Sequence, residues 1–178
     1  MGFLFVSGNL GLDFAGTVGA RRDRRVEMLP SPADLARWTV EAGLLDTAPS
    51  AAPADLASAR ALREAIYALA TQARTGEPLD AANLDALNTA AALPPPTVRL
   101  DPSGLTRSGS VTNALSAVAR ATITLLGDPD TARLRECEAE TCTRLFIDAS
   151  RHKARRWCDM RRCGNRAKAA AYRTRHHP

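Results

Sequence analysis

The sequence predicts a mainly α protein, in which a helical N-terminal domain with a small β element (residues 1–130) precedes a short C-terminal module (residues 133–178). Three observations predict this organisation. Much of the 45% apolar content is alanine, which favours helix over sheet. Before residue 130, apolar residues recur at three- and four-residue steps, as on one face of a helix. All four cysteines lie in the module, which has too few large apolar residues to fold on burial alone.

The first predicted elements are short. The apolar run at residues 3–6 suits a strand or the start of a buried segment. Ser31 is expected to cap a helix that has Pro32 at its first position, because serine accepts a hydrogen bond from the unpaired N–H groups there and proline has no N–H to satisfy. This helix should end near Gly43.

The longest predicted helix covers residues 54–74, where apolar residues follow helical spacing, and Gly76 should close it. Another helix is expected at residues 80–92. Three consecutive prolines at residues 94–96 should stop it, because the residue before a proline avoids the helical conformation.

A small hairpin is expected next, with residues 97–100 pairing with residues 105–106 across the turn at 101–104. Ser110 should then cap a last helix of this domain, which carries apolar residues on one face as far as about residue 125. The N-terminal part therefore reads as one helical domain.

The charge is distributed unevenly along the chain. Residues 1–132 hold 11 Lys/Arg against 14 Asp/Glu, a net charge of −3, whereas residues 133–178 hold 13 against 5, a net charge of +8. The excess positive charge thus lies in the module, where a polyanion can bind it. The arginine-rich stretch at residues 21–25 is expected to be an exposed loop that extends the basic surface if it lies near the module.

No segment approaches the roughly 20 apolar residues of a membrane-spanning helix, and the first residues lack the basic leader of a secretory signal. We therefore expect the protein to stay in the cytoplasm. Under reducing conditions, four cysteines in paired spacing favour a metal site over two disulfides.

The cysteines form two pairs, Cys137 with Cys142 and Cys158 with Cys163. Four residues separate the members of each pair and fifteen residues separate the pairs, so that two turns of chain can supply four thiolates to one tetrahedral ion. Soft sulfur ligands favour one zinc ion, and four of them leave no open position, so the site should be structural. An iron–sulfur cluster, reduced core cysteines and disulfides are the alternatives. His152 is then expected at solvent or a phosphate.

The segment after the second pair should be a basic helix capped by Asp159. Trp157 is expected to pack over the metal module, and Gly164 to allow close approach of the first cysteine turn. One arc of this helix carries small residues and should pack over the module: Cys163, Ala167, Ala170, Ala171 and Thr174.

The rest of the helix circumference is polar and mostly basic, and no acidic residue follows Asp159. A solvated helix usually alternates charge signs, so this pattern favours a nucleic-acid contact. Asparagine and arginine can bind base edges in the major groove. The candidate helix residues are Arg161, Arg162, Asn165, Arg166, Lys168, Tyr172, Arg173 and Arg175. Four further residues, between the cysteine pairs, are better placed for phosphates: Arg151, Lys153, Arg155 and Arg156.

The stretch from Trp157 to Lys168 resembles the CGNR zinc-finger family, named for the tetrapeptide that stands here at residues 163–166. The N-terminal stretch at residues 10–17 resembles the opening of the ABATE domain that usually precedes this finger, although Gly16 stands where the family commonly has asparagine. The resemblance implies a bacterial, stress-induced transcription regulator with a zinc finger.

The leading functional hypothesis is a zinc-dependent regulator that binds double-stranded DNA, with an N-terminal domain that senses a small-molecule effector, forms a homodimer, or both. The alternative is an RNA- or ribosome-binding zinc-ribbon-like protein. Membrane association is not expected. An enzyme is not expected either, because no histidine precedes His152 and the sequence contains no phosphate-loop pattern.

Overall fold

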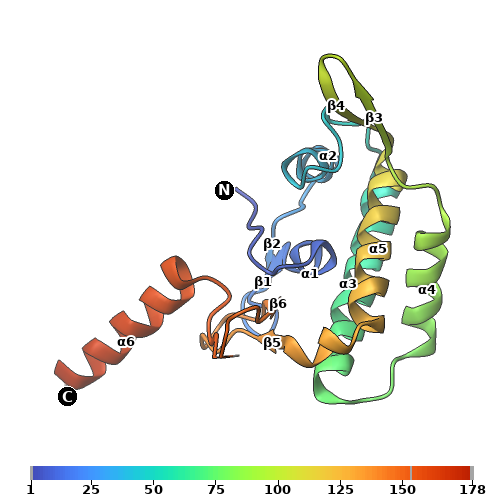
Figure 1. The fold of residues 1–178 in the computed structure, drawn as a ribbon. Coiled ribbons are helices and arrows are strands. Elements are labelled where there is room, and N and C mark those ends of the chain that lie inside the picture. Colours follow the sequence, from blue (N-terminus) through green and yellow to red (C-terminus); the bar gives the residue numbers. More distant parts are fainter. Residues whose placement is uncertain (1, 153, 177–178) are drawn as a thin grey trace.

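The computed structural model describes residues 2–152 and 154–176, and helices dominate its N-terminal part (Figure 1). The helices are α1 (Leu10–Ala15), α2 (Pro32–Glu41), α3 (Pro53–Thr75), α4 (Ala81–Ala92), α5 (Val111–Gly127) and α6 (Asn165–His176). The strands form three antiparallel pairs: β1 (Val18–Gly19) with β2 (Val26–Glu27), β3 (Thr97–Asp101) with β4 (Gly104–Ser108), and β5 (Leu134–Glu136) with β6 (Leu145–Ile147). Among the described residues, none of the helices has the length and apolar character that crossing a membrane requires.

Helix α3 is the centre of the N-terminal part, with α4 and α5 packed along it and α1 and α2 against it (Figure 1). Pro53 begins the helix, the Asp55 carboxylate accepts a 2.7 Å hydrogen bond from the Ala52 N–H, and Gly76 ends it in the left-handed region at φ 76°. The core includes Trp38, whose ring centroid lies 4.8 Å from that of Phe14. Because these side chains are fully buried, each contributes about 1.5–3 kcal/mol of apolar burial.

The helices predicted after residue 31 and the hairpin are confirmed, with boundaries shifted by at most a few residues. The Ser31 side chain accepts the predicted N-cap hydrogen bond, from the Asp34 N–H. The segment at residues 3–6 is neither a strand nor buried, because Phe5 is 40% exposed and the other three residues are half-buried. The backbone N–H groups of Val6 and Ser7 donate to the Asp13 carboxylate at 3.0 and 2.9 Å. In a strand, such N–H groups would instead donate to backbone carbonyls.

Asp13 lies on α1, a helix that the sequence analysis missed. Six residues are too few to show helical periodicity, but Asn9 caps the helix by accepting from the Gly11 N–H at 2.9 Å.

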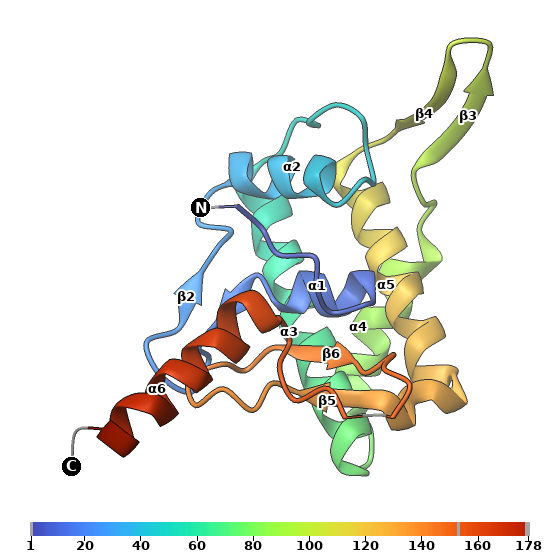
Figure 2. The ribbon, with the colours of Figure 1, turned by 60° about the vertical axis from the view of Figure 1, so that its left-hand side comes forward.

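The β5–β6 hairpin of the C-terminal module packs directly on the helical part (Figure 2). Leu134 and Leu145 from the hairpin share a buried cluster with Leu12 of α1 and Leu125 of α5. The Ile147 N–H also donates to the Ser7 carbonyl at 2.7 Å. The module is therefore joined to the N-terminal part by apolar burial and by backbone hydrogen bonds.

Arg144 gives this interface a buried charge. Its guanidinium donates to the Gly16 carbonyl at 2.9 Å and to the Leu4 carbonyl at 3.3 Å, and Nη1 lies 3.9 Å from an Asp13 carboxylate oxygen. Burial raises the pKa of Asp13, although hydrogen bonds from Ser7 and the charge of Arg144 oppose the shift. A Cβ on residue 16 would overlap the Arg144 guanidinium, so the glycine at this position makes room for Arg144.

A second buried arginine holds the β1–β2 strand pair against α3. The Arg63 side chain is 1% exposed and donates to both Glu27 carboxylate oxygens, at 2.7 and 2.8 Å. Its Nε also donates to Glu64 at 3.1 Å, and Glu64 accepts from Arg21 as well. Such bidentate pairs fix both partners, and breaking one leaves the other charge buried.

Helix α6 differs from the prediction. Its small-residue arc was expected to pack over the metal module, but Ala170, Ala171 and Thr174 are exposed and only Ala167 is half-buried. The helix extends away from the rest of the chain in both views (Figures 1 and 2). Alanine and threonine bury too little apolar area to hold a twelve-residue helix down, so the basic residues around it decide its exposure.

We expect Glu27→Gln to lower the free energy of unfolding by about 2 kcal/mol, because it removes the bidentate carboxylate from the buried Arg63 guanidinium, which keeps only its pair with Glu64. Glu41→Gln, which breaks the exposed pair with Arg37, should cost no more than about 1 kcal/mol. Burial raises the pKa of Glu27, but hydrogen bonds from Arg63 and Leu29 outweigh it and hold the pKa below its ordinary value of 4.5.

The stability that Glu27 contributes is therefore complete above pH 4.5 and is lost as the pH falls through the lowered pKa. Urea unfolding of the two variants between pH 3 and pH 7 measures both effects. Equal losses in the two variants at pH 7 would contradict a structural role for the Arg63–Glu27 pair.

The packing of α1 to α5 leads us to expect that a fragment of residues 1–130 unfolds cooperatively without zinc. It should be less stable than the full chain, because Leu12 and Leu125 lose their cover from the hairpin. Circular dichroism during thermal unfolding tests this, with and without chelator. A fragment without a cooperative transition would show that the two parts fold only together.

Candidate metal centre and nucleic-acid interface

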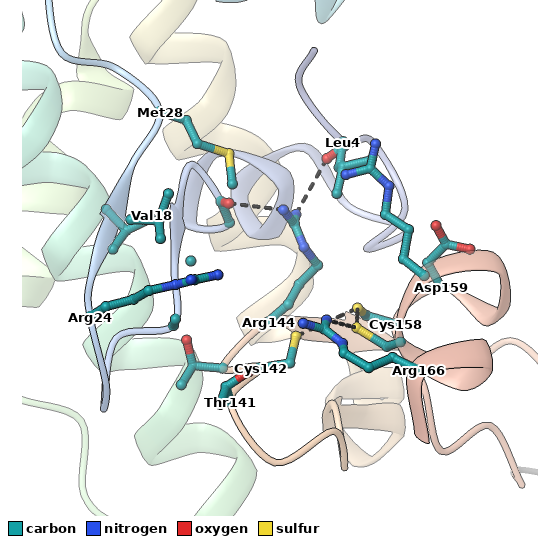
Figure 3. A pocket seen from close by; sticks show the side chains of 17 residues that line it. Leu4, Val18, Arg24, Met28, Thr141, Cys142, Arg144, Cys158, Asp159 and Arg166 are labelled. Atoms are coloured by element: carbon teal, nitrogen blue, oxygen red, sulfur yellow. Dashed lines mark hydrogen bonds between the residues drawn. The ribbon is translucent and has the colours of Figure 1, made fainter. Parts of the chain in front are cut away.

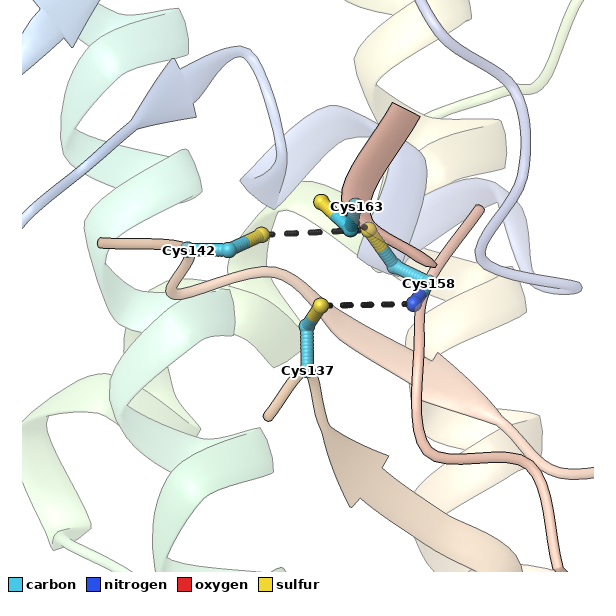
Figure 4. Close-up of side chains that lie close together, drawn as sticks. All are labelled: Cys137, Cys142, Cys158 and Cys163. Carbon is cyan, nitrogen blue, oxygen red and sulfur yellow. Dashed lines mark hydrogen bonds between the residues drawn. The ribbon is translucent and has the colours of Figure 1, made fainter. Parts of the chain in front are cut away.

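Four cysteine side chains converge at the junction of the β5–β6 hairpin and the start of the last helical segment (Figure 4). Cys137 follows β5 and Cys142 lies in the hairpin loop. Cys158 precedes a π-helical turn, η2 (Met160–Gly164), and Cys163 lies within that turn. All four sulfur atoms lie within 4.8 Å of one another. Cys158 Sγ is 3.8 Å from Cys142 Sγ and 3.6 Å from Cys163 Sγ.

This geometry fits zinc. Four sulfurs at about 2.3 Å from a tetrahedral Zn²⁺ ion are separated from one another by about 3.8 Å. Three of the cysteines are buried and Cys142 is half-buried, so the donor set is closed to substrate. The four cysteines are thus positioned to bind one metal ion, in agreement with the predicted single structural zinc.

Local hydrogen bonds to backbone groups fix the two chain turns that orient the cysteine side chains. In the first turn, the Cys142 N–H donates to the Ala139 carbonyl at 2.8 Å. In the second, the Asp159 carboxylate accepts from the Arg161 N–H at 2.9 Å, which confirms Asp159 as the N-cap. The Cys163 N–H then donates to the Asp159 carbonyl at 2.9 Å, and the Cys158 N–H points at Cys137 Sγ at 3.4 Å. A π-turn here carries Cys163 back to the cluster.

The thiols perturb one another's ionisation. Hydrogen bonds from Cys142 and Cys158 lower the pKa of Cys137 to about 7, and hydrogen bonds within the cluster also lower the pKa of Cys163. The same contacts raise the pKa values of Cys142 and Cys158, because neighbouring thiolates repel further negative charge. Full ionisation of the cluster therefore needs a cation, which zinc supplies. Arg166 donates to Cys163 Sγ at 3.4 Å and adds positive charge beside the thiolates.

Aromatic side chains cover the cluster. Phe146 is fully buried beside the cysteines and Trp157 packs half-buried against them, so Trp157 packs over the module as predicted. The explanation for Gly164 changes, because its close neighbours are not in the first cysteine turn. A Cβ on residue 164 would overlap the Met160 sulfur and lie 3.0 Å from a Trp157 ring carbon.

Most of the predicted nucleic-acid contacts lie on the surface beside and beyond the metal centre. The exposed ones are Arg151, Arg156, Arg161, Arg162, Asn165, Arg166, Lys168, Tyr172 and Arg173. Lys153 lies outside the described residues. For Arg175 the structure describes the helical backbone and not the side chain.

Two of the arginines between the cysteine pairs make contacts within the protein. Arg155 is half-buried, and its guanidinium donates to the Val6 carbonyl at 2.9 Å, donates to the Cys158 carbonyl and lies 4.5 Å from the Phe146 ring centroid. It therefore holds the module together and against the N-terminus. Arg156 pairs with Glu138 at 2.6 Å but remains exposed, so a phosphate would have to compete for it.

A cavity of about 440 Å³ adjoins the cysteine cluster, between the module and the β1–β2 strand pair (Figure 3). The sequence analysis missed it, together with the positions of Arg24 and Arg144 in its lining. The sequence contained one indication of this surface. The arginine-rich stretch at residues 21–25 does lie near the module, where Arg22 pairs with Glu136 at 2.7 Å. A single sequence carries no sign of the walls that complete the cavity.

Two family models match the chain, one over the helical part and one over the C-terminal module. Residues 8–129 match the family model ABATE, described as "Putative stress-induced transcription regulator". Residues 133–176 match the CGNR zinc finger. Both resemblances noted from the sequence are confirmed. No curated protein matches the chain.

The purified protein should carry one zinc ion per chain, and Cys158→Ser should release it, because three thiolates leave an open position. Arg166→Gln should keep zinc but lose it to a chelator about tenfold faster, since a group that hydrogen bonds to a metal ligand tunes metal affinity. Lys168→Gln, on the same helix, is the matched control.

Elemental analysis and a colorimetric zinc-release assay measure these quantities. Full zinc retention in Cys158→Ser would contradict the four-sulfur site. Equal release rates for Arg166→Gln and Lys168→Gln would show that Arg166 does not brace the cluster.

Proposed function

The chain belongs to the ABATE family, and from this membership and its basic zinc finger we propose that it is a transcription regulator that binds double-stranded DNA. In this proposal Cys137, Cys142, Cys158 and Cys163 bind one structural zinc ion, and the segment from residue 160 to residue 176 contacts the DNA. The zinc does no chemistry. It fixes the start of the basic segment relative to the helical domain. We place the activity in the cytoplasm, where the thiols stay reduced.

The observation that supports this proposal most strongly is the exposure of α6. Residues 160–176 hold six Lys/Arg and no Asp/Glu, and residues 161–174 are exposed except Cys163, Gly164 and Ala167. Like charges along one helix repel each other unless an anion neutralises them. Phosphates do so, and the release of their counterions supplies most of the affinity.

The dimensions also fit a duplex. A twelve-residue helix is about 18 Å long and is narrow enough for the major groove, which is about 12 Å wide. Arg161, Asn165, Lys168 and Tyr172 lie along one stripe of the helical segment, at steps of three and four residues. The alanine face of α6 is exposed, so these residues need not be uncovered before the helix enters the groove.

Two positions of the tetrapeptide at residues 163–166 have a second role in this proposal. Arg166 donates to Cys163 Sγ, and the Asn165 side chain donates to the Arg161 carbonyl at 3.2 Å. Both residues therefore brace the metal turn. Arg161, Lys168 and Arg173, whose side chains make no such contact to the cluster, are the residues that we propose for phosphate and base contacts.

The N-terminal part is proposed to regulate this binding, by sensing a small molecule, by forming a homodimer, or by both. For the homodimer, the supporting feature is the β3–β4 hairpin, which projects from the body (Figure 2). Its sheet has two strands, and Val98 and Leu100 are 63% and 80% exposed. Open strand edges with exposed apolar residues pair readily with a second copy.

RNA is the second candidate, because a basic zinc module with few aromatic residues, 4% of the chain, can bind either polymer. Competition between duplex DNA and a structured RNA at equal salt separates the two. DNA should compete better if α6 enters a major groove, because the deep, narrow major groove of an RNA helix excludes it.

Arg173→Ala should weaken binding to all DNA sequences about equally and reduce the slope of log affinity against log salt by about one, because it removes one phosphate contact. Arg120→Ala, an exposed arginine on α5, is the control and should leave both quantities unchanged. Reversal of Arg161, Lys168 and Arg173 to glutamate should abolish binding while zinc content stays at one per chain.

Fluorescence anisotropy over a salt series, with zinc content measured on the same samples, provides the test. Unchanged DNA affinity in the triple reversal would rule out α6 as the contact. Loss of zinc in that variant would instead assign those residues to the metal module.

A further inference from the structure

The cavity of about 440 Å³ lies between two parts of the chain that are far apart in sequence (Figure 3). The β1–β2 side contributes Val18, Val26 and Met28, and the N-terminal segment contributes Leu4. The finger contributes Thr141 to Arg144 and the cysteine turns at residues 158–166. The volume falls in the range of about 300–1,000 Å³ that small-molecule sites occupy. Apolar walls with a few convergent polar groups are the usual composition of such sites.

The charged groups in the lining are mostly positive. Arg24, Arg144, Arg162 and Arg166 line the cavity, and Asp159 is the one carboxylate in the lining. Figure 3 shows Arg24 extending from the β1–β2 side toward the space beside Arg144.

Two of these arginines are already engaged. Arg166 donates to Cys163 Sγ, and Arg144 donates to two backbone carbonyls beside Asp13. For Arg24 and Arg162, by contrast, the described residues provide no carboxylate within ion-pair distance. Asp159 is occupied in turn by the Arg161 N–H, for which it is the N-cap. The cavity therefore presents two guanidinium groups without a counter-charge beside an apolar wall.

We propose that this cavity binds a small organic anion, with an apolar body against Leu4, Val18 and Met28 and a carboxylate or similar group held by Arg24 and Arg162. Guanidinium groups bind planar anions such as carboxylates through paired hydrogen bonds. A bare inorganic anion would leave the apolar wall in contact with water, and a neutral apolar molecule would leave the guanidinium groups unpaired.

The same ligand weakens DNA binding, and this second step rests on the proposed function. Arg162 lies at the start of the basic segment, two residues after Met160, and lines the cavity as well. A bound anion neutralises Arg162 and reduces the positive potential that attracts phosphate. Because coupling between two sites is reciprocal, DNA must weaken anion binding by the same factor. The ligand contacts both the N-terminal part and the finger, so its binding acts directly on a residue of the DNA-binding segment.

The test uses three probes on the full zinc-loaded chain: 2-naphthoate, its neutral amide 2-naphthamide, and inorganic phosphate. Isothermal titration calorimetry should show one naphthoate per chain, bound at least about tenfold more tightly than either other probe, the factor expected for one charge-assisted contact. Arg24→Gln should reduce naphthoate affinity to that of the amide. Arg120→Gln, which removes an exposed arginine outside the cavity lining, should leave it unchanged.

Met28→Trp provides a second variant, because a larger side chain fills the cavity from the half-buried β1–β2 side. It should abolish naphthoate binding while the circular dichroism spectrum and the zinc content stay those of the unaltered chain. Naphthoate binding that survives in Met28→Trp, or that the amide equals, would overturn the proposal. Phosphate binding as tight as that of naphthoate would overturn it too, by reducing the cavity to a bare anion site.

Anisotropy with duplex DNA then tests the coupling. Saturating naphthoate should raise the DNA dissociation constant about fivefold in the unaltered chain and not in Arg24→Gln, which keeps the basic helix intact. An unchanged DNA dissociation constant in the unaltered chain would overturn the coupling. If the chain binds naphthoate but no DNA, the proposed function fails and the cavity site stands. If it binds DNA but no naphthoate, the cavity proposal alone fails.

Discussion

The constraint on which the C-terminal structure depends is the repulsion among four thiolates held within 4.8 Å of one another. Such a cluster is stable when a divalent cation balances it, and the two chain turns that carry it have few other means of holding together. Phe146 and Trp157 cover the sulfurs but bury too little area to order some forty residues. Metal binding thus fixes the turn at residues 158–164, and that turn sets the direction in which α6 leaves the body.

Arginine side chains connect the metal module and the β1–β2 strand pair to the rest of the chain. Arg144 reaches from the cysteine loop to carbonyls of the N-terminal segment, and Arg155 reaches from the second cysteine turn to Val6. Arg63 does the same for the β1–β2 strand pair, which faces the finger across the cavity. A guanidinium with five donors can hydrogen bond to several carbonyls or carboxylates at once. Each of these residues therefore joins segments that no sheet of the described residues connects. The finger and the helical part consequently form a continuous structure.

The elements that could be predicted from the sequence are those that local patterns decide. Helices α2 to α5 were predicted from periodicity, from the Ser31 and Ser110 caps and from Gly76, and the metal site from the cysteine spacing alone. Sequence patterns do not show contacts that the folded chain creates. The N–H groups of Val6 and Ser7 donate to the Asp13 carboxylate and not to a second strand. Arg155, which has the sequence context of a surface cation, contacts Phe146 and Val6. The cavity depends on two such long-range junctions and leaves no local pattern.

The exposed alanine face of α6 has a thermodynamic consequence. Isolated helices of twelve residues are marginal in water, because nucleation costs more than a few hydrogen bonds return. The metal turn removes part of that cost by fixing the first residues, but Ala170 and Ala171 in the distal turns are exposed and bury little apolar area. Under the proposed function, DNA phosphates relieve the repulsion among the arginines and shift the helix–coil equilibrium of these turns toward helix. Ordering of the turns is then coupled to binding, which lowers the affinity gained per contact while leaving the segment able to fit different duplex geometries.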